Sequence, residues 1–125
     1  MAKTLAELIV YQKALAASRE ISAILRRESL KRDPRLRDQL GASSERVASS
    51  IAEGFEQSTD RHFAQYLYRS RGSSSEVRTQ LIVARDRRYI DESECANLSG
   101  KYEEIAKMLT GLIAHLEKED RKHRR

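Results

Sequence analysis

The stretch TDRHFAQYLYRSRGSSSEVRTQLIVARDRRYI, which runs from Thr59 to Ile90, decides the fold. Its apolar and small residues recur every three or four positions, the spacing of one face of an α-helix. The stripe comprises Phe63, Tyr66, Leu67, Ser70, Ser74, Val77, Leu81 and Ala84. Sustained over about eight turns, it predicts a rod on the order of 40 Å long. Two shorter helices with a break between Gly72 and Ser75 are the alternative, because glycine inside a helix costs about 1 kcal/mol relative to alanine.

The glycine and serines at the centre of this stretch indicate that something packs closely there. Ser74 lies on the stripe, whereas Gly72 lies about half a turn away from it. We therefore predict that Ser74 faces the core and that Gly72 faces outward, toward a neighbouring subunit.

Three further amphipathic segments accompany this helix, so the sequence predicts helices over about residues 5–30, 34–55, 59–88 and 92–118, with a frayed basic tail at 119–125. The start signals are Asp33 before Pro34, Thr59, and the capping box from Asp91 to Glu94. In the first helix, one predicted face holds Tyr11, Ala14, Leu15, Ser18, Ile21 and Leu25, with Val10, Ala17 and Ile24 on its flank. Four such helices joined by short loops predict a single all-α domain over residues 1–125, an antiparallel up-down-up-down four-helix bundle.

Composition narrows the class of protein further. The chain has one proline, no tryptophan and 34% charged residues, which favours charged helices around one core. No apolar run approaches the roughly 18 to 20 residues of a membrane span, so no membrane partner is expected. Glu7 interrupts the apolar N-terminal stretch and argues against a signal peptide. The lone Cys95 excludes an internal disulfide and fits a cytoplasmic location.

No set of residues in the sequence suits catalysis. The Glu-x-x-His pattern of di-metal bundles does not occur, and the three histidines are scattered. Cys95 falls on an apolar stripe and is interpreted as a small buried hydrophobe. We therefore predict no catalytic residue, no metal and no cofactor. Glu53, next to Gly54 at a helix end, is interpreted as an inward hydrogen-bond acceptor, with a solvated side chain as the alternative.

Positive charge is concentrated near one end of the predicted bundle. The net charge is +5, and the segment from Arg19 to Arg37 alone has seven basic and three acidic residues. The turn after the third helix lies at the same end and adds further arginines, diluted by four acidic residues. Such an end attracts the phosphate backbone of nucleic acid. The predicted nucleic-acid-binding residues are Arg26, Arg27, Lys31, Arg32, Arg35, Arg37 and Arg88. A solvated surface that keeps the protein soluble is the alternative.

Several short motifs carry a family resemblance over most of the chain, from Leu8 to Leu116. They are LIVYQKA at 8–14, IAEG at 51–54, RGS at 71–73 with Glu76, TQL at 79–81, and the Tyr89-Ile90 pair. This ordered set resembles the 23S rRNA-intervening-sequence proteins. The resemblance implies a four-helix bundle without an assigned activity, assembly into pentameric rings, and a relation to the accessory protein of diversity-generating retroelement reverse transcriptases. Residues Gly41, Ala42, Ser50 and Gln57 depart from the family pattern, which weakens any nucleic-acid site that the family forms there.

A second, weaker stripe on the helix at 59–88 suggests self-association. It contains Ala64, Tyr68, Ser75 and Ile82 and, with Gly72, forms the predicted homo-oligomer interface. Isolated exposed apolar residues, which are common on monomers, are the alternative. The leading hypothesis is thus a non-enzymatic, self-associating helical module. An adaptor that binds RNA or DNA through the basic end is the second hypothesis, and no residues favour a third, a hydrolase or metal enzyme.

Overall fold

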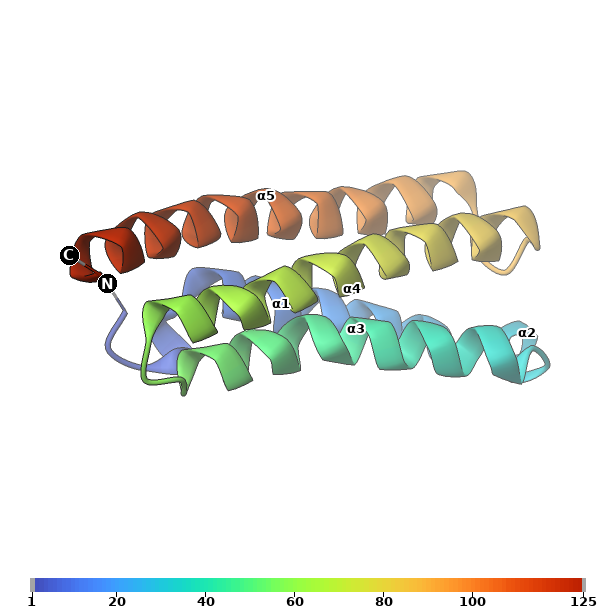
Figure 1. Cartoon of the computed structure of the whole chain (residues 1–125). Coiled ribbons are helices and arrows are strands. Elements are labelled where there is room, and N and C mark those ends of the chain that lie inside the picture. The colour runs from blue at the N-terminus through green and yellow to red at the C-terminus, as the bar shows by residue number, and fades with distance from the viewer. Residues whose placement is uncertain (1, 125) are drawn as a thin grey trace.

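Four long helices build the computed structural model, which describes residues 2–124 (Figure 1). They are α1 (Ile9–Leu25), α3 (Pro34–Phe55), α4 (Asp60–Asp86) and α5 (Glu92–His123). A short 3-10 helix, η1 (Leu5–Glu7), precedes α1, and one turn of helix, α2 (Glu28–Lys31), separates α1 from α3. The long helices alternate in direction, and α4 packs against both α3 and α5 while α1 packs against those same two helices. The predicted all-α, up-down-up-down bundle is confirmed, and no strand occurs within the described residues.

The first predicted helix begins later than expected, at Ile9, but the three predicted start signals are confirmed, because each depends on local chemistry. The Asp33 carboxylate accepts a hydrogen bond from the Leu36 N–H at 3.4 Å, and Pro34 occupies the first helical position. The Thr59 hydroxyl accepts from the His62 N–H at 3.2 Å. At the start of α5, Asp91 and Glu94 cap each other's backbone N–H groups, at 2.8 and 3.1 Å.

Helix α4 is continuous through Gly72, so the single rod is confirmed and the alternative of two shorter helices is wrong. Every residue of its predicted stripe is buried except Tyr66, which is half-buried. Serines in this stripe hydrogen-bond across the bundle: the Ser70 hydroxyl donates to the Val47 carbonyl at 2.7 Å, and the Ser74 hydroxyl donates to the Tyr102 carbonyl at 2.9 Å. Their small side chains let α4 approach α3 and α5 closely while their hydroxyls remain satisfied.

The first helix differs from its prediction in length and in orientation. Instead of one helix over 5–30, α1 ends at Leu25, and extended backbone at Arg27 precedes α2. The buried face comprises Val10, Ala14, Ala17, Ile21 and Ile24, so the predicted flank lies at the centre of the core. Tyr11, Leu15 and Leu25 pack against the core from its edge.

The last helix is longer than predicted, because α5 continues to His123 and residues 119–123 are helical. Ile113 and Leu116 are buried and anchor this part of the helix. Beyond them, Lys122 pairs with Glu119 at 3.3 Å, and Arg124 pairs with Asp120 at 3.7 Å. Such pairs, three and four residues apart, support helix to its end.

Ion pairs of alternating sign fix the register between α1 and α5. Lys13 pairs with Glu104 at 2.9 Å, Glu20 pairs with Lys101, and Arg27 pairs with Glu94. Lys13 and Glu20 are seven residues apart and lie on one side of α1, and Arg27 follows seven residues later, in the extended backbone between α1 and α2. A shift of either helix would bring like charges together, which specifies one pairing. None of the described helices is long and apolar enough to cross a membrane.

Candidate nucleic-acid interface and the outer face of α4

The predicted basic end exists, because α2 and the turn between α4 and α5 lie at the same end of the bundle (Figure 1). We call this end, formed by residues 26–37 and 85–94, the turn end. Two crosslinks hold it together. The Arg27 guanidinium donates to the Tyr89 carbonyl at 3.0 Å and binds both carboxylate oxygens of Glu94. The Asp33 carboxylate accepts from Arg87 at 2.8 Å and from the Tyr89 hydroxyl at 2.9 Å.

These crosslinks shift the acidity of the groups that form them. The hydrogen bond from Tyr89, helped by the Leu36 N–H and by Arg87, lowers the pKa of the Asp33 carboxyl. The same bond raises the pKa of the Tyr89 hydroxyl. The Arg27 guanidinium lowers the pKa of Glu94. The carboxylates of Asp33 and Glu94 are therefore held ionised by structural partners.

Ion pairing divides the predicted nucleic-acid-binding residues into two groups. Arg27 bridges to Glu94, Lys31 pairs with Glu28 at 3.4 Å, and Arg37 pairs with Asp38 at 3.6 Å. By contrast, the ion pairs of residues 2–124 include none formed by the other four predicted cations, Arg26, Arg32, Arg35 and Arg88. All four side chains are exposed. We refer to these four residues as the free arginines.

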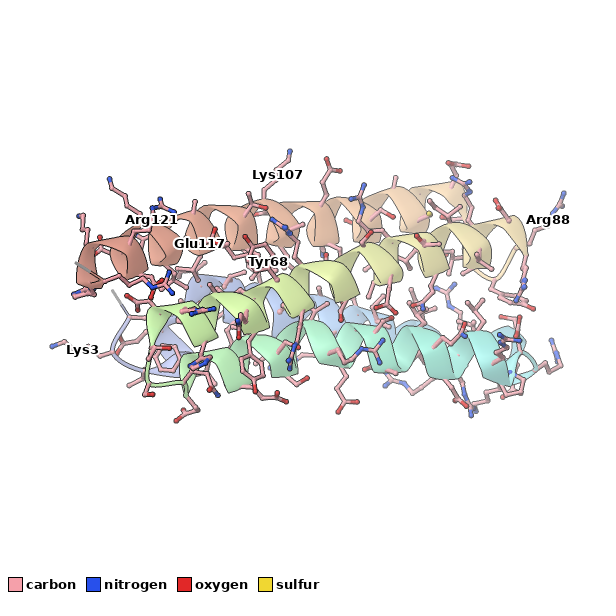
Figure 2. The ribbon with its side chains drawn as sticks, in the orientation of Figure 1. Lys3, Tyr68, Arg88, Lys107, Glu117 and Arg121 are labelled. Carbon is pink, nitrogen blue, oxygen red and sulfur yellow. The ribbon has the colours of Figure 1, made fainter. Side chains whose placement is uncertain are left out.

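Arg88 has left-handed backbone, with φ of 65°. It follows the end of α4, where its N–H donates to the Arg85 carbonyl and the Tyr89 N–H donates to the Ala84 carbonyl, each at 2.9 Å. This is a Schellman motif, in which the left-handed position is normally glycine. The Arg88 side chain extends beyond the helix ends into solvent (Figure 2).

The outer face of α4 carries most of the predicted oligomer interface. Tyr68 and Ile82 are 42% and 44% exposed, and Gly72 and Ser75 between them are also exposed. Ala64 is only 3% exposed because it packs into the subunit's own core, so its assignment to the exposed stripe is wrong. Thr79 was missed, although it completes the regular spacing between Ser75 and Ile82. We define the α4 stripe as Tyr68, Gly72, Ser75, Thr79 and Ile82.

Tyr68 is held in place at the edge of α5 (Figure 2). Its hydroxyl donates to the Glu117 carboxylate at 3.1 Å, and this bond raises the pKa of the hydroxyl. The Arg71 guanidinium lies 4.9 Å from the centre of its ring, a cation–π contact. The exposed ring is therefore ordered.

A groove of about 560 Å³ lies between α3 and α4, beside the α4 stripe. Gly72, Ser75 and Thr79 form one wall and Leu36 and Gln39 the other. Its end reaches the turn end, where Asp33, Arg35 and Arg87 line it.

The remaining candidate positions offer little chemistry. Within residues 2–124, no three histidine, cysteine, aspartate or glutamate side chains come together as metal ligands. Cys95 is 4% exposed and lies 3.6 Å from the Leu81 carbonyl, as expected for a small core residue. Glu53 is exposed, so its interpretation as an inward acceptor is wrong; its backbone carbonyl accepts from the Gln57 side chain at 3.0 Å.

Comparison with known proteins supports the fold and identifies the family. One similar crystal structure is that of a protein with unknown function from the S23 ribosomal protein family of Bacteroides thetaiotaomicron VPI-5482. It has 19% sequence identity and a TM-score of 0.75, and the alignment covers 83% of this chain and 97% of that one. At this identity the likeness shows the fold alone. No curated protein matches the chain.

The family comparison covers η1, α1, α2, α3, α4 and most of α5. Residues 6–111 match the family described as 23S rRNA-intervening sequence protein. Neither this match nor the structural neighbour names a catalytic activity. Because the match spans most of the sequence, the chain belongs to the family of 23S rRNA-intervening sequence proteins.

Proposed function

We propose that the chain is a non-enzymatic subunit of a homo-oligomeric scaffold, pentameric as the resemblance implies, and that the α4 stripe is a contact between subunits. The observation that carries the proposal is the exposure of Tyr68 and Ile82 at the two ends of a row of small residues. Tyr68 and Ile82 are, with Ile9, the large hydrophobic side chains exposed among the described residues. Two of these three thus lie on one face of one helix.

The spacing of the α4 stripe suits helix packing. Its members follow one another at intervals of four, three, four and three residues. This 3.5-residue repeat keeps a stripe facing a partner helix, as in coiled coils. Gly72 and Ser75 in its centre permit close approach, and the larger Tyr68 and Ile82 supply apolar area at its ends.

The surroundings of the stripe also favour a partner. The ordered ring of Tyr68 loses little conformational entropy on contact, because Glu117 and Arg71 already fix it. The groove between α3 and α4 continues the surface of the stripe and provides space for side chains of a second copy. A ring requires that each subunit use two different surfaces. The α4 stripe is one of them, and about 800 Å² per subunit would make a stable contact.

Light scattering after size exclusion tests the proposal. The unmodified chain is expected to elute as a single assembly at micromolar concentration. Ser75→Arg places a long charged side chain in the middle of the stripe and should dissociate the assembly. Ala114→Arg is the matched control, since it adds the same charge at an exposed position on α5 and should leave assembly intact.

Each contrary result is informative. A monomeric unmodified chain would refute the scaffold. An assembly that survives Ser75→Arg, with both variants equally folded by circular dichroism, would exclude the α4 stripe as the contact.

A further inference from the structure

We infer that the free arginines at the turn end form a binding site for the phosphodiester backbone of a nucleic acid. The site lies within one subunit, so the inference does not depend on assembly through α4. The inference rests on two observations. Four cations without an ion pair lie at the same end of the bundle, and two of them, Arg35 and Arg88, occupy positions where the local backbone disfavours arginine.

Subtracting the internal pairs shows how much positive charge remains for a ligand. At the turn end, Arg27, Lys31, Arg37, Arg85 and Arg87 each pair with a carboxylate. The acids that dilute the cluster are therefore largely occupied by these five cations. The free arginines retain their charge and point to solvent, as binding to phosphate requires.

Helix dipoles explain two of the four free arginines. Arg26 and Arg32 directly follow the C-termini of α1 and α2. A cation at that position is stabilised by the partial negative charge of the helix end. These two residues would be expected there without any ligand.

Arg35 and Arg88 oppose the local preferences. Arg35 occupies the first turn of α3, where the partial positive charge of the helix favours an acidic side chain. Arg88 holds a left-handed backbone that favours glycine. Neither forms an ion pair within the described residues that would compensate. Residues that break a local rule in this way are concentrated at functional sites.

These two arginines belong to adjoining segments. The Arg87 guanidinium lies 2.8 Å from the Asp33 carboxylate, which joins the segment before Arg35 to the segment before Arg88. Tyr89 binds the same carboxylate at 2.9 Å. The crosslinks of the turn end thus hold the backbones of both arginines in fixed positions, as a preorganised site requires.

The chemistry of the site favours backbone recognition over base recognition. Proteins that bind the bases of a single-stranded nucleic acid use exposed aromatic rings, on which the bases stack. The exposed large hydrophobics of the described residues are Ile9, Tyr68 and Ile82, and none lies at the turn end. Exposed arginines bind phosphates through their charge, and such contacts carry no sequence information.

Fluorescence anisotropy with a labelled 20-base-pair duplex and a labelled 20-nucleotide RNA of mixed sequence tests the inference. Four phosphate contacts per subunit predict a slope of log affinity against log salt of about −3.6 on the duplex and about −2.8 on the single strand. Raising salt from 50 to 200 mM should then weaken duplex binding about 150-fold. The two probes separate double-stranded from single-stranded partners.

The deciding variant is Arg35→Glu with Arg88→Gly, because both changes improve local structure. Glutamate suits the first turn of α3 and glycine suits the left-handed position, so the Tm should rise by about 3 to 6 °C. Loss of two phosphate contacts should nevertheless weaken duplex binding about 60-fold at 0.1 M salt, and the slope should fall by about 1.8. A purely structural pair of residues would not weaken binding while raising the Tm.

The matched control is Arg61→Glu with Arg121→Gln, which removes the same net charge. Arg61 occupies the first turn of α4, as Arg35 does in α3, but Arg61 and Arg121 line a hollow between the start of α4 and the end of α5. This control should retain most of the affinity.

The inference is wrong if the two double variants weaken binding equally, if the Arg35→Glu/Arg88→Gly protein binds as the unmodified chain does, or if neither probe binds at 50 mM salt. Light scattering on the same samples reports whether the chain assembles, so a failure to bind nucleic acid is distinguished from a failure to assemble through the α4 stripe.

Discussion

Single residues show how tightly this core is specified, and Tyr102 is the clearest case. Its side chain is fully buried, and its hydroxyl has no hydrogen-bond partner among the described residues. Burial raises the pKa of this hydroxyl well above its ordinary range. A buried, unsatisfied hydroxyl costs about 1 to 3 kcal/mol of folding free energy. The packing of the Tyr102 ring stabilises the core, and its buried hydroxyl destabilises it.

We therefore expect Tyr102→Phe to raise the free energy of unfolding by about 1 kcal/mol, since it removes only the unsatisfied hydroxyl. Urea unfolding measures this. Tyr89→Phe is the control with the opposite sign, because the Tyr89 hydroxyl donates to the Asp33 carboxylate at 2.9 Å, and its loss should lower the free energy of unfolding. A less stable Tyr102→Phe protein would show that the Tyr102 hydroxyl does have a partner.

Residue types alone did not reveal which glycine has a close neighbour. The sequence suggested close packing at Gly72, yet a Cβ added there would meet no atom within 4 Å. Gly54, interpreted from the sequence as a helix end, is the crowded one: its Cβ would lie 2.8 Å from Tyr66 Cβ and 2.9 Å from a Phe63 ring carbon. That contact depends on how α3 and α4 cross, which no local signal specifies.

At the scale of elements, the sequence predicted the helix ends that depend on neighbouring residues and did not predict those that depend on residues far away in the chain. The caps at Asp33, Thr59 and Asp91 use partners three residues away. The break between α1 and α2 places Arg27 against Tyr89 and Glu94, which are 62 and 67 residues away. A pattern within one segment cannot contain such a cause. The helical end of α5 could have been predicted from the sequence, because the ion pairs that support it join residues only three and four positions apart.

The same distinction holds for the candidate site. Charge counting predicted the end at which cations gather, because the bundle topology was predictable. It did not show that Arg27, Lys31 and Arg37 are paired, since pairing depends on side-chain geometry. The left-handed backbone of Arg88 has no signal in the sequence, because glycine is the residue expected there.

The crosslink at Asp33 makes stability at the turn end depend on pH. Its pKa is lower in the folded chain than the ordinary value of 3.8. Above that ordinary value the carboxylate is ionised in both states, and its stabilisation is fully present. As the pH falls, the unfolded chain takes up the proton first, and the stabilisation is lost as the pH passes through the folded pKa.

We expect the Tm of the unmodified chain to fall on acidification from pH 5 to pH 2, and that of Asp33→Asn to fall less steeply. Asparagine keeps the helix cap, so the difference reports the ionised contacts. Tyr89→Phe should also flatten the curve, because the hydrogen bond from Tyr89 is the largest cause of the lowered pKa. Identical pH profiles for all three proteins would contradict this assignment.

At the scale of the whole molecule, the two proposed surfaces adjoin, because Arg35 lines the end of the groove that runs beside the α4 stripe. The α4 stripe lies along the side of the bundle, and the free arginines lie at one end of it. In a ring whose subunits run parallel to the axis, every turn end would face the same side. Several weak phosphate sites on one side would then act together, raising affinity through effective concentration without a new contact.

Gly72 connects the stability of the subunit to that of the assembly. Because nothing in the subunit lies within 4 Å of a Cβ at this position, Gly72→Ala should stabilise the isolated bundle by about 1 kcal/mol on helix propensity. In the assembly, the same methyl group would meet the partner helix that the α4 stripe is proposed to contact. We expect thermal melts of dilute protein to show a more stable subunit, and light scattering to show a weaker assembly.

Gly54→Ala provides the comparison, because its added methyl group clashes within the subunit and should cost about 1 to 3 kcal/mol. Two glycine-to-alanine changes with the same intrinsic preference should thus have opposite effects on the subunit. Only the change at Gly72 should weaken the assembly of a bundle that remains folded. A Gly72→Ala protein that is more stable and fully assembled would show that no partner backbone approaches this glycine. The subunit contact would then lie on another face of the bundle.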